Sequence, residues 1–505
     1  MAIAHKNRAS KQRYISTNQL KLEGYSTPFD QHLDPNNRWV ILASKLPWDE
    51  LVETYNLTMR NRQTGAEGIN GRVIIGSIII KHICDLSDRD TIQLIQENVY
   101  MQYFIGYSSF SREAPFDASL MVEARKRLTG KVVNKINERI ILWKKEFYPQ
   151  DTNQPKQREE STGAESKSQG DKRDDPPLEG QLIMDATACP QDIAYPTDLN
   201  VLNDAREKSE EIIDYLHGQV PKKTKPRTYR KNARKVYLKT AQKRSKSRKE
   251  IRKAIKQQLN YVRRNISTIN QLLDQFDRIP MNEKQLKYFY VIQTVYTQQK
   301  EMYDAKKHSV DHRIVSIHQP HVRPIVRGKV TAPVEFGAKI QVSLMNGFAF
   351  TDEVSWDAFN EGTRLIDSVE KYKQRLGYYP AEVLADKIYC NRDNRSYLKG
   401  KGIHLKAKPL GRPPAVPIHL SPGERNPIEG KFGQAKNSYG LNRIKARLKE
   451  TSESWIASIF LVLNLVKLAG QVPYFLFYTV LDLIDTCLIC IQVQKAQKFN
   501  CKYFA

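Results

Sequence analysis

The chain has 505 residues, of which 40% are hydrophobic, so it can bury a sizeable core and is expected to divide into two to four structural units. Its formal net charge of +26 is too large for an ordinary soluble enzyme and indicates a polyanionic partner, with nucleic acid as the leading candidate. Six scattered cysteines exclude a disulfide-stabilised secreted fold and fit a reducing cytoplasm.

The amino-terminal part of the sequence has the pattern of α-helices. Its first stretch, MAIAHKNRASKQRY, has no apolar segment of the kind that a signal peptide needs, which also favours the cytoplasm. Ser87 and Asp88 precede one periodic segment and Asp117 precedes another, as helix N-caps do. We therefore predict an all-α domain over residues 1–148. Its expected helical segments are 38–55, 71–83, 91–107 and 118–147.

A polar stretch separates this domain from the rest of the chain. Residues 149–178 lack aromatic side chains and nearly lack large aliphatic ones, so we expect a disordered linker. Residues 179–470 are expected to form a second domain, followed by C-terminal apolar helices over 471–505. The apolar stretches 455–470 and 474–493 contain polar or charged residues, so we expect buried core helices there and no membrane span.

The second domain has the pattern of short strands mixed with helices. QLIMDAT, residues 181–187, is a short apolar run that predicts a buried strand. Asn346 and Gly347 join two alternating segments and form a strong hairpin signal. The elements expected after the hairpin are a helix over 364–376, a strand over 381–386, a strand near 403–408 and a further helix containing Glu429.

A large helical insertion is expected after the first strand, over about residues 205–320. Its first helix is predicted to begin near Thr197 or Asp198. From Lys222 to Arg264 there are nineteen Lys or Arg residues and one acid, Glu250. Because so many cations repel one another unless a polyanion lies beside them, this stretch favours a nucleic-acid surface over a solvated helix face.

Three carboxylates stand in distinctive contexts: Asp185 in LIMDATACP, Asp386 at the carboxyl end of an expected strand, and Glu429 in RNPIEGKFGQAK. Two divalent cations that activate a nucleophile and stabilise a leaving oxygen need hard oxygen ligands, usually carboxylates from separate elements. The three residues therefore predict a metal-dependent site that cleaves phosphodiesters.

Each carboxylate also has a structural interpretation. Asp185 can end a strand and Asp386 can cap the turn that follows it. Glu429 falls at the third position of a helix if Asn426 is the N-cap and Pro427 comes first, where a capping-box glutamate belongs. If one of the three chosen carboxylates is not catalytic, the alternative acids are Asp192, Asp198 and Asp352.

The order of elements, with the carboxylates on them, is that of an RNase H-like α/β mixed sheet. The chain also resembles bacterial insertion-sequence transposases of the DDE class, and the resemblance covers most of its length. The pieces that carry the resemblance, in chain order, are 69–107, 116–128, MDATACPQDIAYPTDLNVLNDARE, IHQPHVRPIVRGK, PVEFGAK, LADKIYCNRDNR and RNPIEGKFGQAK.

The resemblance implies a transposase that binds terminal inverted repeats, cleaves DNA at the ends of its element and joins the 3′-hydroxyl ends to target DNA. Asp185, Asp386 and Glu429 would hold two divalent metal ions, Mg²⁺ or Mn²⁺, with Asp185 bridging both. Two double-stranded DNA ends must be held together, which implies at least a homodimer. The N-terminal helices would serve end recognition or dimer contacts.

The resemblance also implies residues that bind DNA. The family's glutamate motif often has a Tyr seven residues before the Glu, an Arg four before and a Lys seven after. Arg425 and Lys436 match, whereas Pro422 stands where the Tyr would be. The full set of expected DNA-binding residues is Arg425, Lys436, Arg323, Arg327, Lys329, Arg230, Arg234, Arg244 and Arg248.

Two other functions stay open at this point: a DNA-binding regulator that lacks catalysis, and an RNase H-like nuclease without strand transfer. A zinc site is not expected from the four histidines at 308, 312, 318 and 321, because no cysteine or third carboxylate pattern completes it. Trp356 is expected in the core rather than on a displaced base, and the pair Cys487 and Cys490 is expected to pack in a helix.

Overall fold

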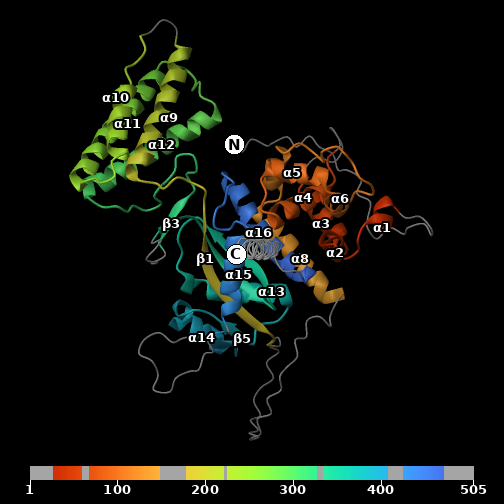
Figure 1. The fold of residues 1–505 in the computed structure, drawn as a ribbon. Helices are drawn as coiled ribbons and strands as arrows, with labels where there is room; N and C mark the ends of the chain where they lie inside the picture. The colour runs from red at the N-terminus through yellow and green to blue at the C-terminus, as the bar shows by residue number, and fades with distance from the viewer. Residues whose placement is uncertain are drawn as a thin grey trace, which may run out of the picture.

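The structure, a computed structural model, describes residues 27–59, 68–147, 178–220, 224–326, 334–407, 423 and 425–470. Figure 1 shows a group of N-terminal helices, a separate bundle that contains α9 to α12, and a sheet between helices of the C-terminal part. The expected linker over 149–178 and the helices over 471–505 lie almost wholly or wholly outside the described residues, so the predicted domain boundaries stay predictions.

The N-terminal helices are short and amphipathic or wholly buried. They are α1 Pro28–His32, α2 Arg38–Lys45, α3 Trp48–Asn56, α4 Gly71–Ile83, α5 Asp88–Glu97, α6 Val99–Phe104, α7 Leu120–Arg127 and α8 Gly130–Phe147. Helix α4 is buried along nearly its whole length, so it forms the centre of this group. Trp48, Phe104 and Trp39 pack their rings together around it.

Three expected segments are each divided into two helices. Pro47 separates α2 from α3, and Asn98 begins α6 by accepting a hydrogen bond from the Met101 N–H. The expected N-cap Ser87 is confirmed, since its hydroxyl accepts from the Asp90 N–H. The expected cap Asp117 is wrong: it accepts from the Ser119 N–H in a turn, and α7 begins only at Leu120.

The described residues contain a six-stranded mixed sheet. Its strands are β1 Gln181–Pro190, β2 Arg323–Val326, β3 Val334–Met345, β4 Phe348–Ser355, β5 Glu382–Leu384 and β6 His404–Lys406. The order is β2-β3-β1-β5-β6, with β4 also paired to β3. Strand β1 is antiparallel to β3 and parallel to β5, which places it in the middle of the sheet.

The hairpin between β3 and β4 is confirmed at the expected residues. Asn346 and Gly347 have φ angles of 50° and 76°, as a two-residue hairpin turn requires of both central residues. A side chain at Gly347 would also meet the Lys467 ammonium group. Local turn chemistry therefore sets the register of these strands, although a bulge shifts it between Gln341 and Val342.

Helices cover both faces of the sheet. On one face lie α13 Leu365–Leu376 and α14 Arg392–Gly400, which pack on Leu182 and Met184 of β1. On the other face lie α15 Asn426–Ser438 and α16 Lys449–Ala469, which share a core with Ile183 and the N-terminal helices. Since side chains alternate along a strand, Asp185 points to the same face as Ile183 and α15.

Helix α16 connects the N-terminal helices to the sheet. It packs against α8, α7, α4 and β4, and Figure 1 shows it between the two regions. The amide of Asn464 donates to the Asn137 side chain on α8 (2.9 Å) and to the Ala349 carbonyl on β4 (2.8 Å). It is long and apolar enough to cross a membrane, but 83% of its apolar window is buried inside the protein. This confirms the expected core helix.

Between β1 and β2 the chain forms α9 Asp198–Gln219, α10 Arg230–Ala241, α11 Arg248–Leu273 and α12 Glu283–Ala305. The start of α9 is confirmed, because Thr197 caps it by accepting from the Asn200 N–H. Ser247 and Asn282 begin α11 and α12 with capping boxes. These helices bury a hydrophobic core of their own, which includes Leu202, Ile213 and Val262.

Candidate active site and nucleic-acid surface

Asp185 lies in the middle of β1, in the middle of the sheet. Its Oδ1 accepts a hydrogen bond from the Ala186 N–H at 2.8 Å, which leaves Oδ2 facing away from its own backbone. The side chain is 18% exposed. A carboxylate on a rigid central strand, with one oxygen anchored and one directed outward, is well placed to bind a cation or a cationic side chain.

Asp386 follows β5 and lies level with Asp185. The parallel register pairs Ile183 with Leu384, so the residues two positions further along, Asp185 and Asp386, come side by side. Asp386 Oδ1 accepts a hydrogen bond from the Lys387 N–H at 2.7 Å. Asp386 is therefore the N-cap of a short 3-10 helix, η3 Lys387–Tyr389. The structural interpretation of Asp386 as a cap is therefore correct, and the same geometry brings its carboxylate to the end of the sheet.

Arg425 joins the two carboxylates. It precedes α15, and its guanidinium donates from one terminal nitrogen to Asp185 Oδ2 at 3.3 Å and lies 3.2 Å from Asp386 Oδ1 through the other. The arginine side chain is 27% exposed, whereas that of Asp386 is 56% exposed. The pair therefore opens to solvent on the Asp386 side.

The pKa of Asp185 is raised to about 6, first because burial disfavours the charged carboxylate. The hydrogen bond from Ala186 and the charge of Arg425 oppose the rise, while the charges of Glu361 and Asp386 add to it. A raised carboxylate pKa beside a second carboxylate is typical of sites where charges are held close together for chemistry or for cation binding.

Glu361 is a neighbour that the sequence did not indicate. It begins η2 Glu361–Thr363, and its carboxylate lies 2.8 Å from the ammonium of Lys339. The side-chain amides of Asn391 and Asn394 both donate to the Gly362 carbonyl, at 2.9 and 2.7 Å, which ties η2 to the segment after Asp386. No local motif marks Glu361, because its place depends on this packing.

Glu429 lies on the exposed side of the first turns of α15. The expected capping box is wrong: the helix begins at Asn426, Arg425 occupies the N-cap position, and no side chain caps it. Ile428 and Phe432 pack toward the sheet instead. Within the described residues, no recorded interaction joins Glu429 to Asp185 or Asp386, and no three His, Cys, Asp or Glu side chains form a group able to hold a metal.

The residues present therefore fit a divalent cation in part. The carboxylates of Asp185 and Asp386 are hard oxygen donors of the kind that Mg²⁺ and Mn²⁺ prefer, and the structure brings them together. Glu429 follows Arg425 by one helical turn but is not gathered with them. The named substitutes are engaged elsewhere, since Asp192, Asp198 and Asp352 form ion pairs with Arg443, Arg313 and Arg375.

The basic helices present most of their cations to solvent. Arg234, Arg244 and Arg248 are exposed on α10, the following turn and α11. Arg230 differs, because both of its terminal nitrogens donate to Asp214. The other exposed cations of this surface with no recorded acidic partner among the described residues are Arg227, Lys231, Lys235, Lys239, Lys246, Lys249, Lys253, Lys256, Arg263 and Arg264.

Two of the remaining expected DNA-binding residues, Arg323 and Lys436, are less accessible. Arg323 is half-buried beside Asp357, at 3.4 Å, and burial lowers the pKa of its guanidinium. Lys436 is half-buried on α15. Arg327 and Lys329 lie outside the described residues.

Three of the four histidines between 308 and 321 contact different residues. His312 contacts Asp357, His318 contacts the Tyr288 hydroxyl, and His321 packs edge-on against Trp356. Trp356 is buried, and its indole N–H donates to Glu453 at 2.9 Å, which confirms the expected core role. Cys487 and Cys490 lie outside the described residues.

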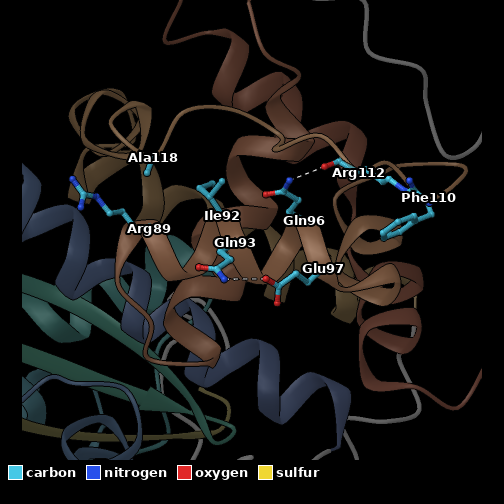
Figure 2. A pocket seen from close by; sticks show the side chains of 8 residues that line it. All are labelled: Arg89, Ile92, Gln93, Gln96, Glu97, Phe110, Arg112 and Ala118. Carbon is cyan, nitrogen blue, oxygen red and sulfur yellow. Dashed lines mark hydrogen bonds between the residues drawn. The ribbon is translucent and has the colours of Figure 1, made fainter.

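A wide pocket of about 700 Å³ lies on the N-terminal helices. Figure 2 shows its lining: two arginines, two glutamines, a glutamate, a phenylalanine and two small or aliphatic residues. Gln93 donates to Glu97, and Gln96 donates to the Arg112 carbonyl. None of the expected catalytic residues lines this pocket, and its single carboxylate already accepts a hydrogen bond, so it is not the candidate active site.

Comparisons with known proteins indicate transposase domains in two parts of the chain. Residues 383–466 match a family model described as a transposase DDE domain, and residues 27–127 match one described as a transposase domain (DUF772). An uncharacterized protein, ORF8 in the nfe locus of Rhizobium meliloti, is 35% identical over 99 residues, which are 20% of this chain and 47% of that relative. The match thus spans about half the length of the relative. No solved structure matches.

The first matched segment contains Asp386, Arg425 and Glu429, and the second contains the helices α1 to α7. The two models therefore cover most of the N-terminal helices and one member of the acid pair, Asp386, whereas Asp185 on β1 lies outside both matches. These matches support the resemblance of the chain to insertion-sequence transposases of the DDE class.

Proposed function

We propose that the protein is a DNA transposase whose catalytic centre is built on Asp185 and Asp386, within an RNase H-like sheet. The observation that carries the proposal is the pairing of these carboxylates on neighbouring parallel strands, level with each other and closed by Arg425. Glu429, one helical turn after Arg425, is proposed as the third ligand.

The proposed chemistry is cleavage of a DNA phosphodiester followed by attack of the freed 3′-hydroxyl on target DNA. Divalent ions at these carboxylates, Mg²⁺ or Mn²⁺, would supply Lewis-acid stabilisation of the phosphorus centre. The chain's own contribution is to fix the acids on rigid elements: Ala186 anchors one oxygen of Asp185, and Lys387 anchors one oxygen of Asp386. Such anchoring keeps the donors in place without reorganisation.

The exposed cations of α10 and α11 are proposed to bind the DNA backbone. Most of the cations that these helices expose have no acidic partner in the part of the chain that the structure describes, and phosphate neutralisation releases counterions that favour binding. Double-stranded terminal repeats and target DNA are the proposed partners. A homodimer on paired ends, at work on DNA in the bacterial cytoplasm, completes the proposal.

Product analysis on DNA that carries the flanking ends tests this function. We expect the wild type to cut and join in Mg²⁺, whereas Asp386→Asn and Glu429→Gln bind DNA without chemistry. Asp192→Asn is the matched control, because that aspartate forms an ion pair with exposed Arg443 and, among the described residues, has none with Arg425. Cut ends that are never joined would identify a nuclease instead. A shifted but uncut probe with the wild type would identify a binding protein and contradict the proposal.

A further inference from the structure

Arg425 makes contacts that a residue devoted to DNA phosphate would not make. Its two terminal nitrogens go to two different carboxylates, Asp185 and Asp386. Its Nε is buried and has no hydrogen-bond partner among the described residues. The guanidinium is therefore shared between two acids and is only partly satisfied by them.

These ion pairs are longer than most others among the described residues. The contacts of Arg425 are 3.3 and 3.2 Å, one to each carboxylate. By contrast, Arg125 donates to Asp88 through two nitrogens at 2.8 and 2.7 Å, and Arg375 lies 2.6 Å from Asp352. Charge-assisted hydrogen bonds are strongest when they are short and bidentate, so the contacts of Arg425 are the weaker kind.

The position of Arg425 also allows a second interaction, with an anion. It stands immediately before α15, where backbone N–H groups and the helix dipole favour anions. Asp386, its partner on the open side, is 56% exposed. A guanidinium that leaves the acids can therefore turn toward solvent beside the site where a DNA phosphate would lie.

We propose that Arg425 is an exchangeable counterion of the Asp185–Asp386 pair, which leaves the two carboxylates when a divalent cation binds them and then contacts a DNA phosphate. This inference rests on the proposed function, since it concerns the same acids. Its consequence is that Arg425 competes with metal in the absence of DNA and couples metal binding to DNA binding.

Titration with Mn²⁺ in the absence of DNA, followed by calorimetry and by the spin-resonance signal of free Mn²⁺, tests the exchange. The titration is run at about pH 8, above the pKa of about 6 for Asp185, so that protons do not compete. Two partly exposed ion pairs are lost in Arg425→Ala, so we expect Mn²⁺ to bind roughly fivefold more tightly. Arg425→Lys, which cannot reach both acids at once, should fall between the two.

Arg443→Ala is the matched control, because Arg443 pairs with Asp192 away from this pair of acids. A second readout is the coupling between ligands. Duplex DNA should tighten Mn²⁺ binding to the wild type, and this effect should disappear in Arg425→Ala, which a merely structural role would not produce. Thermal melts of both arginine variants verify that they are folded.

The failures of the two proposals are distinguishable. If Arg425→Ala binds Mn²⁺ no more tightly than the wild type while Asp185→Asn loses binding, the metal site stands and the exchange is wrong. If neither the wild type nor Arg425→Ala binds Mn²⁺, both the exchange and the proposed metal site fail.

Discussion

The acid pair of the sheet and the basic surface of the insertion handle charge in opposite ways. At the sheet, one guanidinium lies within 3.3 Å of each of two carboxylates, of which Asp185 is largely buried and Asp386 is exposed. On α10 and α11, cations such as Arg234 and Arg244 are exposed, with no recorded acidic partner in the described residues. Partnered charge is costly to disturb, whereas exposed charge without acidic partners is available to a polyanion.

The same contrast exists inside the insertion. Arg206 on α9 is 1% exposed and donates to Glu210 at 2.7 Å and to the Asn203 side chain at 2.8 Å. Among the described residues, exposed Arg234, Arg244 and Arg248 have no such network, whereas Arg230 on α10 pairs with Asp214. Residue type and helix alone therefore do not separate a structural arginine from a DNA-binding one; burial and partners do.

The largest expected effect is on catalysis. Asp185→Asn removes the charge of the central carboxylate with little change in shape, so cleavage should fall by roughly 10³-fold or more, since metal-assisted charge stabilisation contributes several kcal/mol. DNA affinity should stay within about twofold, because the basic surface is untouched. A cleavage assay and a gel shift on the same preparation check this. Equal loss of both activities would mean that the two regions are not separable.

A buried partnered cation should affect stability and not DNA binding. Arg206→Ala leaves Glu210 buried without its guanidinium, which costs about 3–5 kcal/mol in the free energy of unfolding. The salt dependence of DNA binding should not change. Urea denaturation and salt-dependent binding measure the two quantities. A stable Arg206→Ala protein with weakened DNA binding would contradict the division into partnered and exposed cations.

Exposed cations should show the reverse pattern. The double variant Arg244→Ala, Arg248→Ala should lower the slope of log affinity against log salt by about 2 and weaken DNA binding roughly 10- to 100-fold at ~0.1 M salt. Its stability should change by less than about 0.5 kcal/mol. Lys131→Ala, Lys135→Ala on α8 is the control, because both lysines are exposed on another helix. An equal slope change in the control would indicate non-specific charge loss.

The smallest effect concerns pH and the stability of the metal-free protein. The pKa of Asp185 is raised to about 6 in the folded state, above its unfolded value of 3.8, so folding takes up a proton between these values. The stability that protonated Asp185 gives the folded protein below pH 4 is lost as the pH rises through 6. Asp185→Asn escapes this loss and should gain about 1–2 kcal/mol near pH 7, after allowance for solvent screening. Melting temperatures against pH test the sign.

Elements governed by local chemistry were predictable from the sequence. The turn at Asn346 and Gly347 and the caps Ser87 and Thr197 depend on neighbouring residues, and the structure confirms them. The predicted N-cap at Asp117 and the predicted capping box of Glu429 were wrong. Helix α7 begins later than expected, at Leu120, and α15 begins earlier than expected, at Asn426. Boundaries of this kind depend on small differences between local alternatives.

Long-range contacts were beyond the sequence. The apolar pattern of α16 indicated a core helix, but its place between the N-terminal helices and the sheet depends on the Asn464 contacts with Asn137 and Ala349. The context of Asp185 and Asp386 indicated a shared site. The bridge from Arg425, and the approach of Glu361, follow only from the folded arrangement.

The position of the bound cation is the most direct test of the account. Fe²⁺ substituted for Mg²⁺ and treated with peroxide and ascorbate generates radicals that cut the chain beside the ion, and mass spectrometry locates the cuts. We predict cuts near Asp185 and Asp386 together, with further cuts between Arg425 and Glu429, all lost in Asp185→Asn. Cuts confined to the histidines between 308 and 321, or cuts that persist in Asp185→Asn, would contradict a catalytic centre built on the acid pair.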